Sequence, residues 1–305
     1  MKILSIVVLC LVLFGFTIKT HAEFKPTNLV VVVSYPAGSS TDAALAPIYK
    51  AIEKRGIKVL RDYRPGGSGV VGINYFHRQP KDGSYFAFSG IGSHFVYNDI
   101  FYKGVQEYTA ADFEYITIAS KIYFAVVGVG TLPNFISNLN KVETTIGVSS
   151  KGQIARANDL LKVVKGTATL VPYKSSGQII PDIQGGHINY AILPVGSVAE
   201  IYRDGKVGIA AVTSENRLPD LPNVAALSEV LPGFAFSGGY GIILPKGVSK
   251  QVINFYSALM MDVLQDKDVV EYYKNNNLYW SPSIFGSKKF TDYIAKSRKD
   301  AGVTQ

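Results

Sequence analysis

Short apolar runs alternate with longer amphipathic segments after the first 28 residues of the chain. The apolar runs, whose length predicts buried strands, cover residues 29–33, 57–60 and 85–89. The amphipathic segments predict helices over residues 42–55, 70–77 and 94–101. Pro47 is expected to kink or restart the first helix. This alternation predicts a mostly parallel sheet covered by helices.

The same alternation returns in the second half of the chain. Its expected strands cover residues 122–129, 145–148, 169–171, 190–193 and 207–212. The helices between them are expected to end near Val164, Gln184 and Arg203. A strand over 241–244 then returns to the first sheet, and the helices that close the first domain are expected over 248–265, 269–275 and 288–299. We therefore predict two α/β domains, residues 23–122 with 236–305 and residues 123–235.

The loop after the first strand has the composition of an anion-binding site. Residues 36–38 (Pro-Ala-Gly) predict a turn, and residues 39–42 (Ser-Ser-Thr-Asp) favour the N-cap of a helix. Ligands of open α/β sheets bind where such a strand ends. A helix N-terminus also offers free N–H groups and a partial positive charge of roughly +0.5. The loop therefore predicts recognition of a small anion.

Neutral hydrogen-bonding side chains recur at the ends of expected strands in both domains. They are Tyr35, Ser39, Ser40, Thr41, Ser93, Ser149, Ser150, Tyr173, Ser175 and Ser176. Hydroxyl and backbone N–H groups can hold a carboxylate without leaving an unpaired buried cation when the site is empty. The alternative is that these residues are ordinary turn and cap formers. Asp42 either completes a first helical turn or faces the ligand, and Lys151 and Lys174 are either solvated or part of the site.

The N-terminus predicts export. Lys2 precedes an apolar stretch over residues 3–18, and Thr20-His21-Ala22 resembles a cleavage site, so we expect a signal peptide cleaved after about Ala22. A membrane anchor is disfavoured because a spanning helix needs about 20 apolar residues. Cys10 lacks the preceding small residues of a lipoprotein signal. As the single cysteine of the chain, it would leave with the signal peptide, so no disulfide or cysteine-based metal site is expected.

The charge of the chain suits an anionic ligand. The net charge of +8 falls to about +6 when Lys2 and Lys19 leave with the signal peptide, and a positive balance attracts anions. The densest basic run, within residues 288–299, is expected to be a solvated helix face. Export argues against a nucleic-acid partner.

Motifs of catalysis and metal binding are missing from the sequence. No Gly-x-Ser-x-Gly or Walker pattern occurs, and the dinucleotide-like start at Gly128 ends at Pro133. Outside the signal peptide the histidines are His77, His94 and His187, which lie far apart. No acidic cluster has calcium or magnesium spacing. We expect no catalytic residues, metal or cofactor, and leave a ligand role for His94 open.

Several short motifs, in one order along the chain, resemble those of the extracytoplasmic solute-binding receptors of tripartite tricarboxylate transporters, the Bug family. These motifs are Tyr35–Asp42, Arg64–Gly69 with Gly72, Pro80–Gly83, Val171–Ser175, Gly185-Gly186 and Ala211–Arg217. The resemblance implies a type II periplasmic-binding-protein fold, with two α/β domains that close over a ligand cleft. It also implies a monomeric periplasmic receptor that captures a small organic acid, without being an enzyme, and delivers it to membrane transporter subunits.

From the residues and the resemblance together we predict one ligand site. Its residues are Tyr35, Ala37, Gly38, Ser39, Ser40, Thr41, Asp42, Ser93, Ser149, Ser150, Gly152, Tyr173, Ser175 and Pro194. The chain departs from the family where Ser39 replaces a glycine, at Ser84, in the loop Lys151-Gly152-Gln153, and at Gly239. Alternative functions are a sensor for a signalling partner, a receptor for a ligand that is not an acid, and a hydrolase on the same scaffold.

Overall fold

A computed structural model of the chain describes residues 24–303. The expected signal peptide, residues 1–22, lies outside the described residues. Between residues 24 and 303, no helix is both long enough and apolar enough to cross a membrane.

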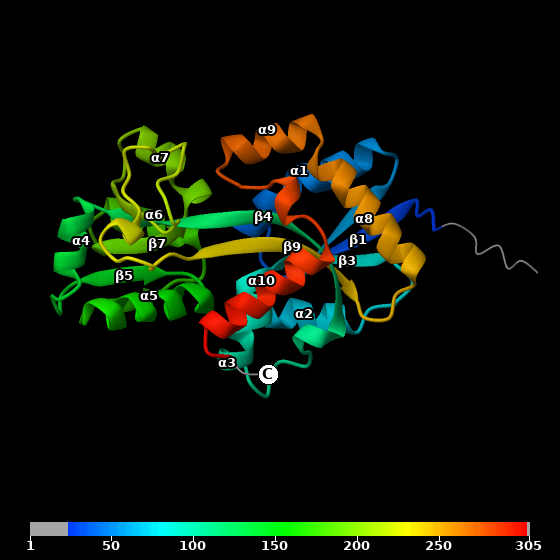
Figure 1. Ribbon diagram of the computed structural model, residues 1–305, viewed down its shortest axis with the longest axis horizontal. Helices are drawn as coiled ribbons and strands as arrows, with labels where there is room; N and C mark the ends of the chain where they lie inside the picture. Colours follow the sequence, from blue (N-terminus) through cyan, green and yellow to red (C-terminus); the bar gives the residue numbers. More distant parts are fainter. Residues whose placement is uncertain (1–23, 304–305) are drawn as a thin grey trace, which may run out of the picture.

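The described residues form one nine-stranded sheet that extends through two lobes (Figure 1). Its strands are β1 (Asn28–Val33), β2 (Lys58–Tyr63), β3 (Tyr85–Gly90), β4 (Phe113–Gly128), β5 (Thr145–Val148), β6 (Thr169–Pro172), β7 (Tyr190–Pro194), β8 (Ile209–Val212) and β9 (Ser237–Pro245). The order across the sheet is β2-β1-β3-β9-β4-β7-β5-β6, with β8 paired to β4. We call the part around β1–β3 the first lobe and the part around β5–β8 the second lobe.

Strands β4 and β9 join the two lobes. They pair antiparallel from Phe113 opposite Pro245 to Tyr123 opposite Ser237. β9 also pairs with β3 of the first lobe, whereas the far half of β4 pairs with β7 and β8 of the second. Within each lobe, β1–β3 and β5–β7 are parallel sets. Two continuous strands therefore connect the lobes through the sheet itself.

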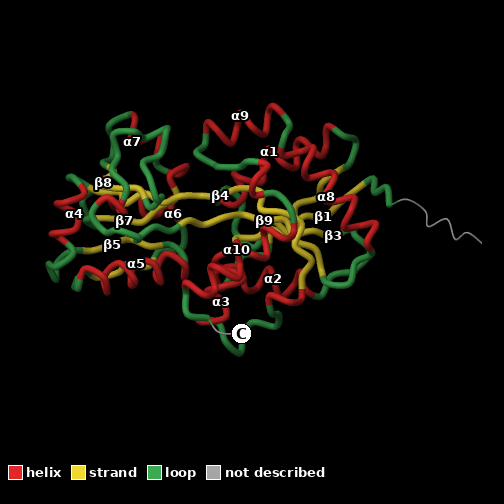
Figure 2. Tube along the Cα trace, viewed as in Figure 1, coloured by secondary structure: helices red, strands yellow, loops and turns green. Residues whose placement is uncertain are grey.

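Helices cover both faces of the sheet in each lobe (Figure 2). They are α1 (Ser40–Lys54), α2 (Val70–His77), α3 (Asn98–Phe101), α4 (Leu132–Asn138), α5 (Lys151–Val164), α6 (Ser176–Gln184), α7 (Ala199–Arg203), α8 (Lys250–Leu264), α9 (Lys267–Asn275) and α10 (Ser287–Asp300). In the first lobe, one core gathers around Leu45 and Tyr256 and another around Phe76 and Phe290. The second lobe is likewise buried on both faces of its strands. This double cover explains why β1 is apolar at successive positions rather than at alternate ones.

The first half of β4 was not predicted, because the strand was expected to begin near Ile122 and begins at Phe113. The pairing of β4 with β9 shifts register between Tyr115 and Thr117 and again between Ile118 and Ser120. Bulges of this kind break the two-residue period that identifies a strand. Thr117 and Ser120 are also fully buried there, so polar side chains interrupt the apolar run.

Two helix predictions in the first lobe are wrong in detail. Of the kink or restart expected at Pro47, the restart does not occur, because α1 is one helix from Ser40 to Lys54. The Pro47 ring is buried, which offsets the backbone hydrogen bond that proline cannot donate. The helix expected over 94–101 is a π-helical turn over Ser93–Tyr97 followed by the short α3. By contrast, α2 and β5 have the predicted bounds.

The basic run near the C-terminus is not a uniformly solvated face. Lys288 is exposed on α10, as expected. The Arg298 side chain, however, is mostly buried, pairs with Asp99, and donates to the Phe95 carbonyl oxygen at 2.8 Å. Arg298 therefore fastens α10 to the segment that follows β3.

Candidate functional site

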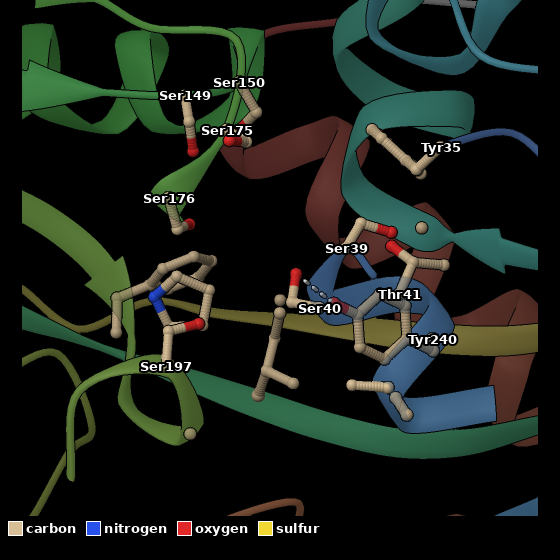
Figure 3. A pocket seen from close by; sticks show the side chains of 18 of the residues that line it. Tyr35, Ser39, Ser40, Thr41, Ser149, Ser150, Ser175, Ser176, Ser197 and Tyr240 are labelled. Atoms are coloured by element: carbon tan, nitrogen blue, oxygen red, sulfur yellow. Dashed lines mark hydrogen bonds between the residues drawn. The ribbon is translucent and has the colours of Figure 1, made fainter. Parts of the chain in front are cut away.

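A cavity of about 650 Å³ lies between the two lobes. Its wall includes the segments that follow the carboxyl ends of β1, β3, β5, β6 and β7. Figure 3 shows the labelled serines of the second lobe across the cavity from Tyr35, Ser39 and Ser40 of the first. The parallel strands of both lobes thus deliver their terminal loops to one place, where open α/β sheets bind ligands.

Three helices begin at this cavity. Ser39, Ser150 and Ser175 are the N-cap residues of α1, α5 and α6, and all three line the wall. The first N–H groups of a helix have no partner inside it, and they lie at the positive end of the helix dipole. The cavity therefore receives backbone donors and partial positive charge from both lobes.

Several wall hydroxyls are engaged as acceptors, which leaves their protons for a ligand. Ser39 Oγ accepts from the Asp42 N–H at 3.3 Å, and Ser150 Oγ accepts from the Gln153 N–H at 3.2 Å. Ser40 Oγ accepts from the Tyr240 hydroxyl at 3.1 Å. A serine hydroxyl has one proton to donate, so these groups present donors to the cavity.

The first-lobe loop is held from behind by buried aromatic groups. Tyr35 stacks on His94, with ring centroids 5.6 Å apart, and donates to the Ser68 carbonyl oxygen at 3.2 Å. Burial raises the pKa of Tyr35 to about 12 and lowers the pKa of His94 to about 3, so both rings are neutral at physiological pH. His94 Nδ1 is 2.7 Å from Ser89 Oγ. His94 is fully buried and supports Tyr35 rather than lining the wall.

The charged residues of the wall are cationic. Within the described residues, the lining includes Arg156 and Lys174 and no aspartate or glutamate. Lys151, which was considered for the site, does not line it, and its ammonium lies 5.3 Å from the Phe101 ring centroid. In the same part of the chain, no group of three histidine, aspartate or glutamate residues is arranged to hold a metal ion.

The two lobes touch at two places beside the cavity. At one, a Cβ at Gly152 of the second lobe would lie 3.1 Å from the Tyr97 ring of the first. At the other, Asn277, buried with φ +54°, donates to the Asp220 carboxylate at 3.2 Å. Both contacts join the two lobes.

The sequence pattern of the TctC family, the tripartite tricarboxylate transporter family receptors, matches residues 49–301. The chain belongs to this family. It is 28% identical over 271 residues to the UPF0065 protein in the tcbD-tcbE intergenic region of Pseudomonas sp. strain P51, covering 82% of this chain and 78% of that one. It is 22% identical over 285 residues to BugT of Bordetella pertussis, covering 88% and 86%. The resemblance drawn from the motifs is confirmed.

Solved structures confirm the two-lobed binding-protein fold of this receptor family. MatC from Rhodopseudomonas palustris, solved with bound malate, has a TM-score of 0.82 at 18% identity, over 91% of this chain and 98% of that one. A second R. palustris protein, solved with adipate, has a TM-score of 0.80 at 21% identity over the same shares. The periplasmic binding protein BugD has a TM-score of 0.78 at 20% identity, again over 91% and 98%.

The departure from the family at Ser39 causes no backbone strain. Ser39 is extended, with φ −70° and ψ 165°, and caps α1 with its side chain. The left-handed residue of this loop is Gly38, with φ +77°. A side chain is therefore tolerated at position 39, where it adds a hydroxyl to the wall.

Twelve of the fourteen residues predicted for the ligand site line the cavity. They are Tyr35, Ala37, Gly38, Ser39, Ser40, Thr41, Ser93, Ser149, Ser150, Gly152, Ser175 and Pro194. Asp42 is not among the lining residues: it accepts from the Gly38 N–H at 2.8 Å and the Tyr63 hydroxyl at 2.7 Å. Tyr173 is not among them either, and its hydroxyl donates to Asp182 at 2.6 Å. The structure therefore gives both side chains partners within their own lobe.

Other wall residues were missed by sequence reasoning. Gln153 and Arg156 of α5 lie one turn apart, and the segments 236–240 and 276–278 approach from β9 and the end of α9. A signal for the first two existed, since residues three apart on a helix share a face and Ser150 already marked its N-terminus. The two segments come from distant sequence and had no local signal.

Proposed function

We propose that this protein is a periplasmic solute-binding receptor that captures a small organic acid between its lobes and delivers it to a membrane transporter. The observation that carries the proposal is a cavity wall rich in hydrogen-bond donors, with no aspartate or glutamate among its residues within 24–303. Three helix N-termini, the hydroxyls of Ser39, Ser40 and Ser150, and two cationic side chains converge there. A carboxylate accepts hydrogen bonds from each of these groups.

The same wall disfavours cationic and neutral ligands. An ammonium group would be buried against helix N-termini with no carboxylate in the described wall to pair it. A sugar would supply acceptors but would also bring hydroxyl protons that need acceptors. The names of two structural neighbours, solved with malate and with adipate, support the acid class.

Capture proceeds by closure of the two lobes about the strands that connect them. We assign the first domain to residues 23–122 and 236–305 and the second to 123–235, which places the crossings within β4 and just before β9. Hinges are element-terminal or strand residues that absorb a change of backbone angle. The contacts of Gly152 with Tyr97 and of Asn277 with Asp220 form when the lobes close.

The receptor is not an enzyme in this proposal. Ser89 and His94 form a serine–histidine contact, but both side chains are fully buried and neither lines the cavity. A nucleophile and its base must reach the substrate. We place the protein in the periplasm as a monomer, with transporter subunits as its partner.

A ligand screen tests the proposal. We expect at least one of malate, adipate, citrate and hexanoate to raise the unfolding temperature. Glucose and cadaverine should not raise it. A ligand at 100 times its Kd stabilises the folded state by about 2.7 kcal/mol, which such a screen resolves. Isothermal titration then gives the affinity of each acid that stabilises.

A pair of serine variants locates the binding. Ser40→Ala removes a hydroxyl that faces the cavity, and we expect it to weaken binding of the best acid by about 10-fold. Ser137→Ala, at an exposed serine of α4 outside the wall, should leave the affinity unchanged. The proposal would be contradicted if none of the acids bound and glucose or cadaverine bound instead.

A further inference from the structure

Gln153 lines the cavity and is fixed with its amide oxygen toward Ser149, so its amide N–H groups point away from Ser149. Its Oε1 accepts from the Ser149 backbone N–H at 2.6 Å and from the Ser149 hydroxyl at 3.1 Å. A backbone N–H can only donate, so the atom facing it must be the amide oxygen. Gln153 is 5% exposed and lines the cavity, and its Nε2 has no hydrogen-bond partner within residues 24–303. Its amide N–H groups are therefore available to an acceptor on a ligand.

Arg156 lies one turn further along α5, on the same face as Gln153. Its guanidinium lies 5.9 Å from the ring centroid of Tyr97 in the first lobe and 5.9 Å from that of Phe236. Its side chain is 22% exposed, and one N–H group donates to Asp159, whose own side chain is 51% exposed, at 3.2 Å. A guanidinium has five N–H donors, so most remain for a ligand.

We propose that Gln153 and Arg156 form a subsite for a second acidic group of the ligand, so that the receptor prefers diacids to monoacids of the same length. The inference rests on the proposed function, and it places the first acidic group of the ligand at the N-terminus of α1. A monoacid held there leaves the partly buried guanidinium with Asp159, an exposed carboxylate, as its counter-charge. A diacid supplies that charge and accepts from Gln153, through charge-assisted hydrogen bonds.

Arg156 also links this subsite to closure. Arg156 belongs to α5 of the second lobe, and its guanidinium lies 5.9 Å from the ring centroid of Tyr97 in the first lobe, so its position depends on how the lobes are arranged. An acid bound to Arg156 therefore interacts most strongly with the closed form, and a ligand shifts a conformational equilibrium by its difference in affinity for the two states.

Isothermal titration with matched acid pairs tests the subsite. The pairs are succinate with butyrate, glutarate with pentanoate, and adipate with hexanoate. We expect the wild-type protein to bind the best diacid at least about 10-fold more tightly than its matched monoacid. Arg156→Gln should weaken binding of the diacid by about 10- to 100-fold and binding of the monoacid by less than about 3-fold. The preference for the diacid is then lost.

Gln153→Glu provides a second variant with conserved shape. Glutamate keeps an oxygen for the Ser149 N–H but places a carboxylate oxygen where the amide N–H groups point. We expect it to abolish the diacid preference by repulsion. Lys162→Gln is the control, because it makes the same charge change at the exposed far end of the same helix. It should leave the preference within about 2-fold of wild type.

The outcomes separate the two proposals. Retention of the wild-type diacid preference by both Arg156→Gln and Gln153→Glu overturns the subsite, while binding of the acids shows that the proposed function holds. Equal affinity of the wild type for diacid and monoacid also overturns the subsite. Failure of the wild type to bind any acid overturns the proposed function and the subsite together.

Discussion

The two walls of the cavity present different chemistry. In the first lobe the polar wall groups carry no net side-chain charge: they are hydroxyls, the amides of Asn276 and Asn277, and the N-terminus of α1. Both cationic wall residues, Arg156 and Lys174, belong to the second lobe. The first wall is also fastened from behind by stacked and hydrogen-bonded side chains, whereas Lys174 of the second wall is exposed.

This difference suggests a division of labour between the lobes. A neutral, fixed wall can hold one carboxylate of almost any organic acid, because preorganised donors bind without reorganising. A cationic wall discriminates among acids by how many charges they bring and where. The predictions below test whether the first wall is rigid and whether the second wall selects.

The largest loss of stability is expected when a side chain is added next to His94, behind the first wall. Gly69 has φ +92°, and a Cβ there would lie 2.0 Å from His94 Nε2, beneath the Tyr35 ring. Gly69→Ala should lower the free energy of unfolding by about 3 kcal/mol, from strain and overpacking together, and should weaken acid binding. Urea denaturation and titration calorimetry measure both.

Gly104→Ala is the matched control for this variant. Gly104 has a similar φ of +88°, but a Cβ there meets no atom within 4 Å. It should cost only the backbone strain, about 1 kcal/mol, and leave binding intact. Equal losses in the two variants would show that contact with His94 is unimportant.

Low pH should lower the free energy of unfolding through protonation of His94, which supports the first wall. Burial lowers its pKa from 6.5 to about 3 in the folded protein, so between these values the unfolded imidazole holds a proton and the folded one does not. The His94 contribution is therefore intact above about pH 6.5 and is progressively lost as the pH falls toward 3. The loss is about 1.4 kcal/mol per pH unit, or about 2 kcal/mol from pH 6.5 to 5.

A His94→Asn variant isolates this titration from those of the carboxyl groups. Stability measured by urea denaturation from pH 5 to 7 should fall more steeply in the wild type than in the variant. Parallel pH profiles would mean that the imidazole charges in the folded state or is accessible to water.

Removal of the hydrogen bonds that Asp42 accepts in the first-lobe loop should have a smaller effect on stability. Asp42→Ala removes the acceptor for the Gly38 N–H and the Tyr63 hydroxyl, so we expect a loss of about 1.5 kcal/mol in unfolding free energy. Tyr63→Phe removes one of these bonds and should cost less. A direct ligand role for Asp42 would instead appear as a large loss of affinity at unchanged stability.

The smallest effect is expected at the exposed cation of the second wall. Lys174→Gln should weaken binding of the best diacid by about 2-fold at low salt, because water screens an exposed charge. The difference should vanish near 1 M salt. A loss comparable with that of Arg156→Gln would show that the two cations act alike.

Much of the fold could be predicted because its elements obey local rules. The bounds of α2 and β5 follow from apolar pattern and flanking turn residues. The first half of β4 could not be predicted, since its bulges and its buried Thr117 and Ser120 depend on pairing with β9, over a hundred residues away. The π-helical turn at Ser93–Tyr97 likewise has no periodic signature.

Some residues of the site could likewise be predicted from the sequence, and others could not. Strand-end serines such as Ser40 and Ser150 could be found because strand ends and helix caps have sequence signals. Tyr173 shows the limit of that reasoning, since its loop lies at the cavity but its hydroxyl is directed to Asp182. Tyr240 and Asn277 reach the wall through tertiary packing alone.

A crystal structure with the tightest-binding diacid tests the central claim most directly. We predict one carboxylate at the α1 N-terminus, within hydrogen-bond distance of Ser39 or Ser40, and the other within hydrogen-bond distance of Gln153 Nε2 and Arg156. A diacid bound outside the cavity, or bound with both carboxylates on the neutral wall and Arg156 turned to solvent, would contradict the division of labour between the lobes.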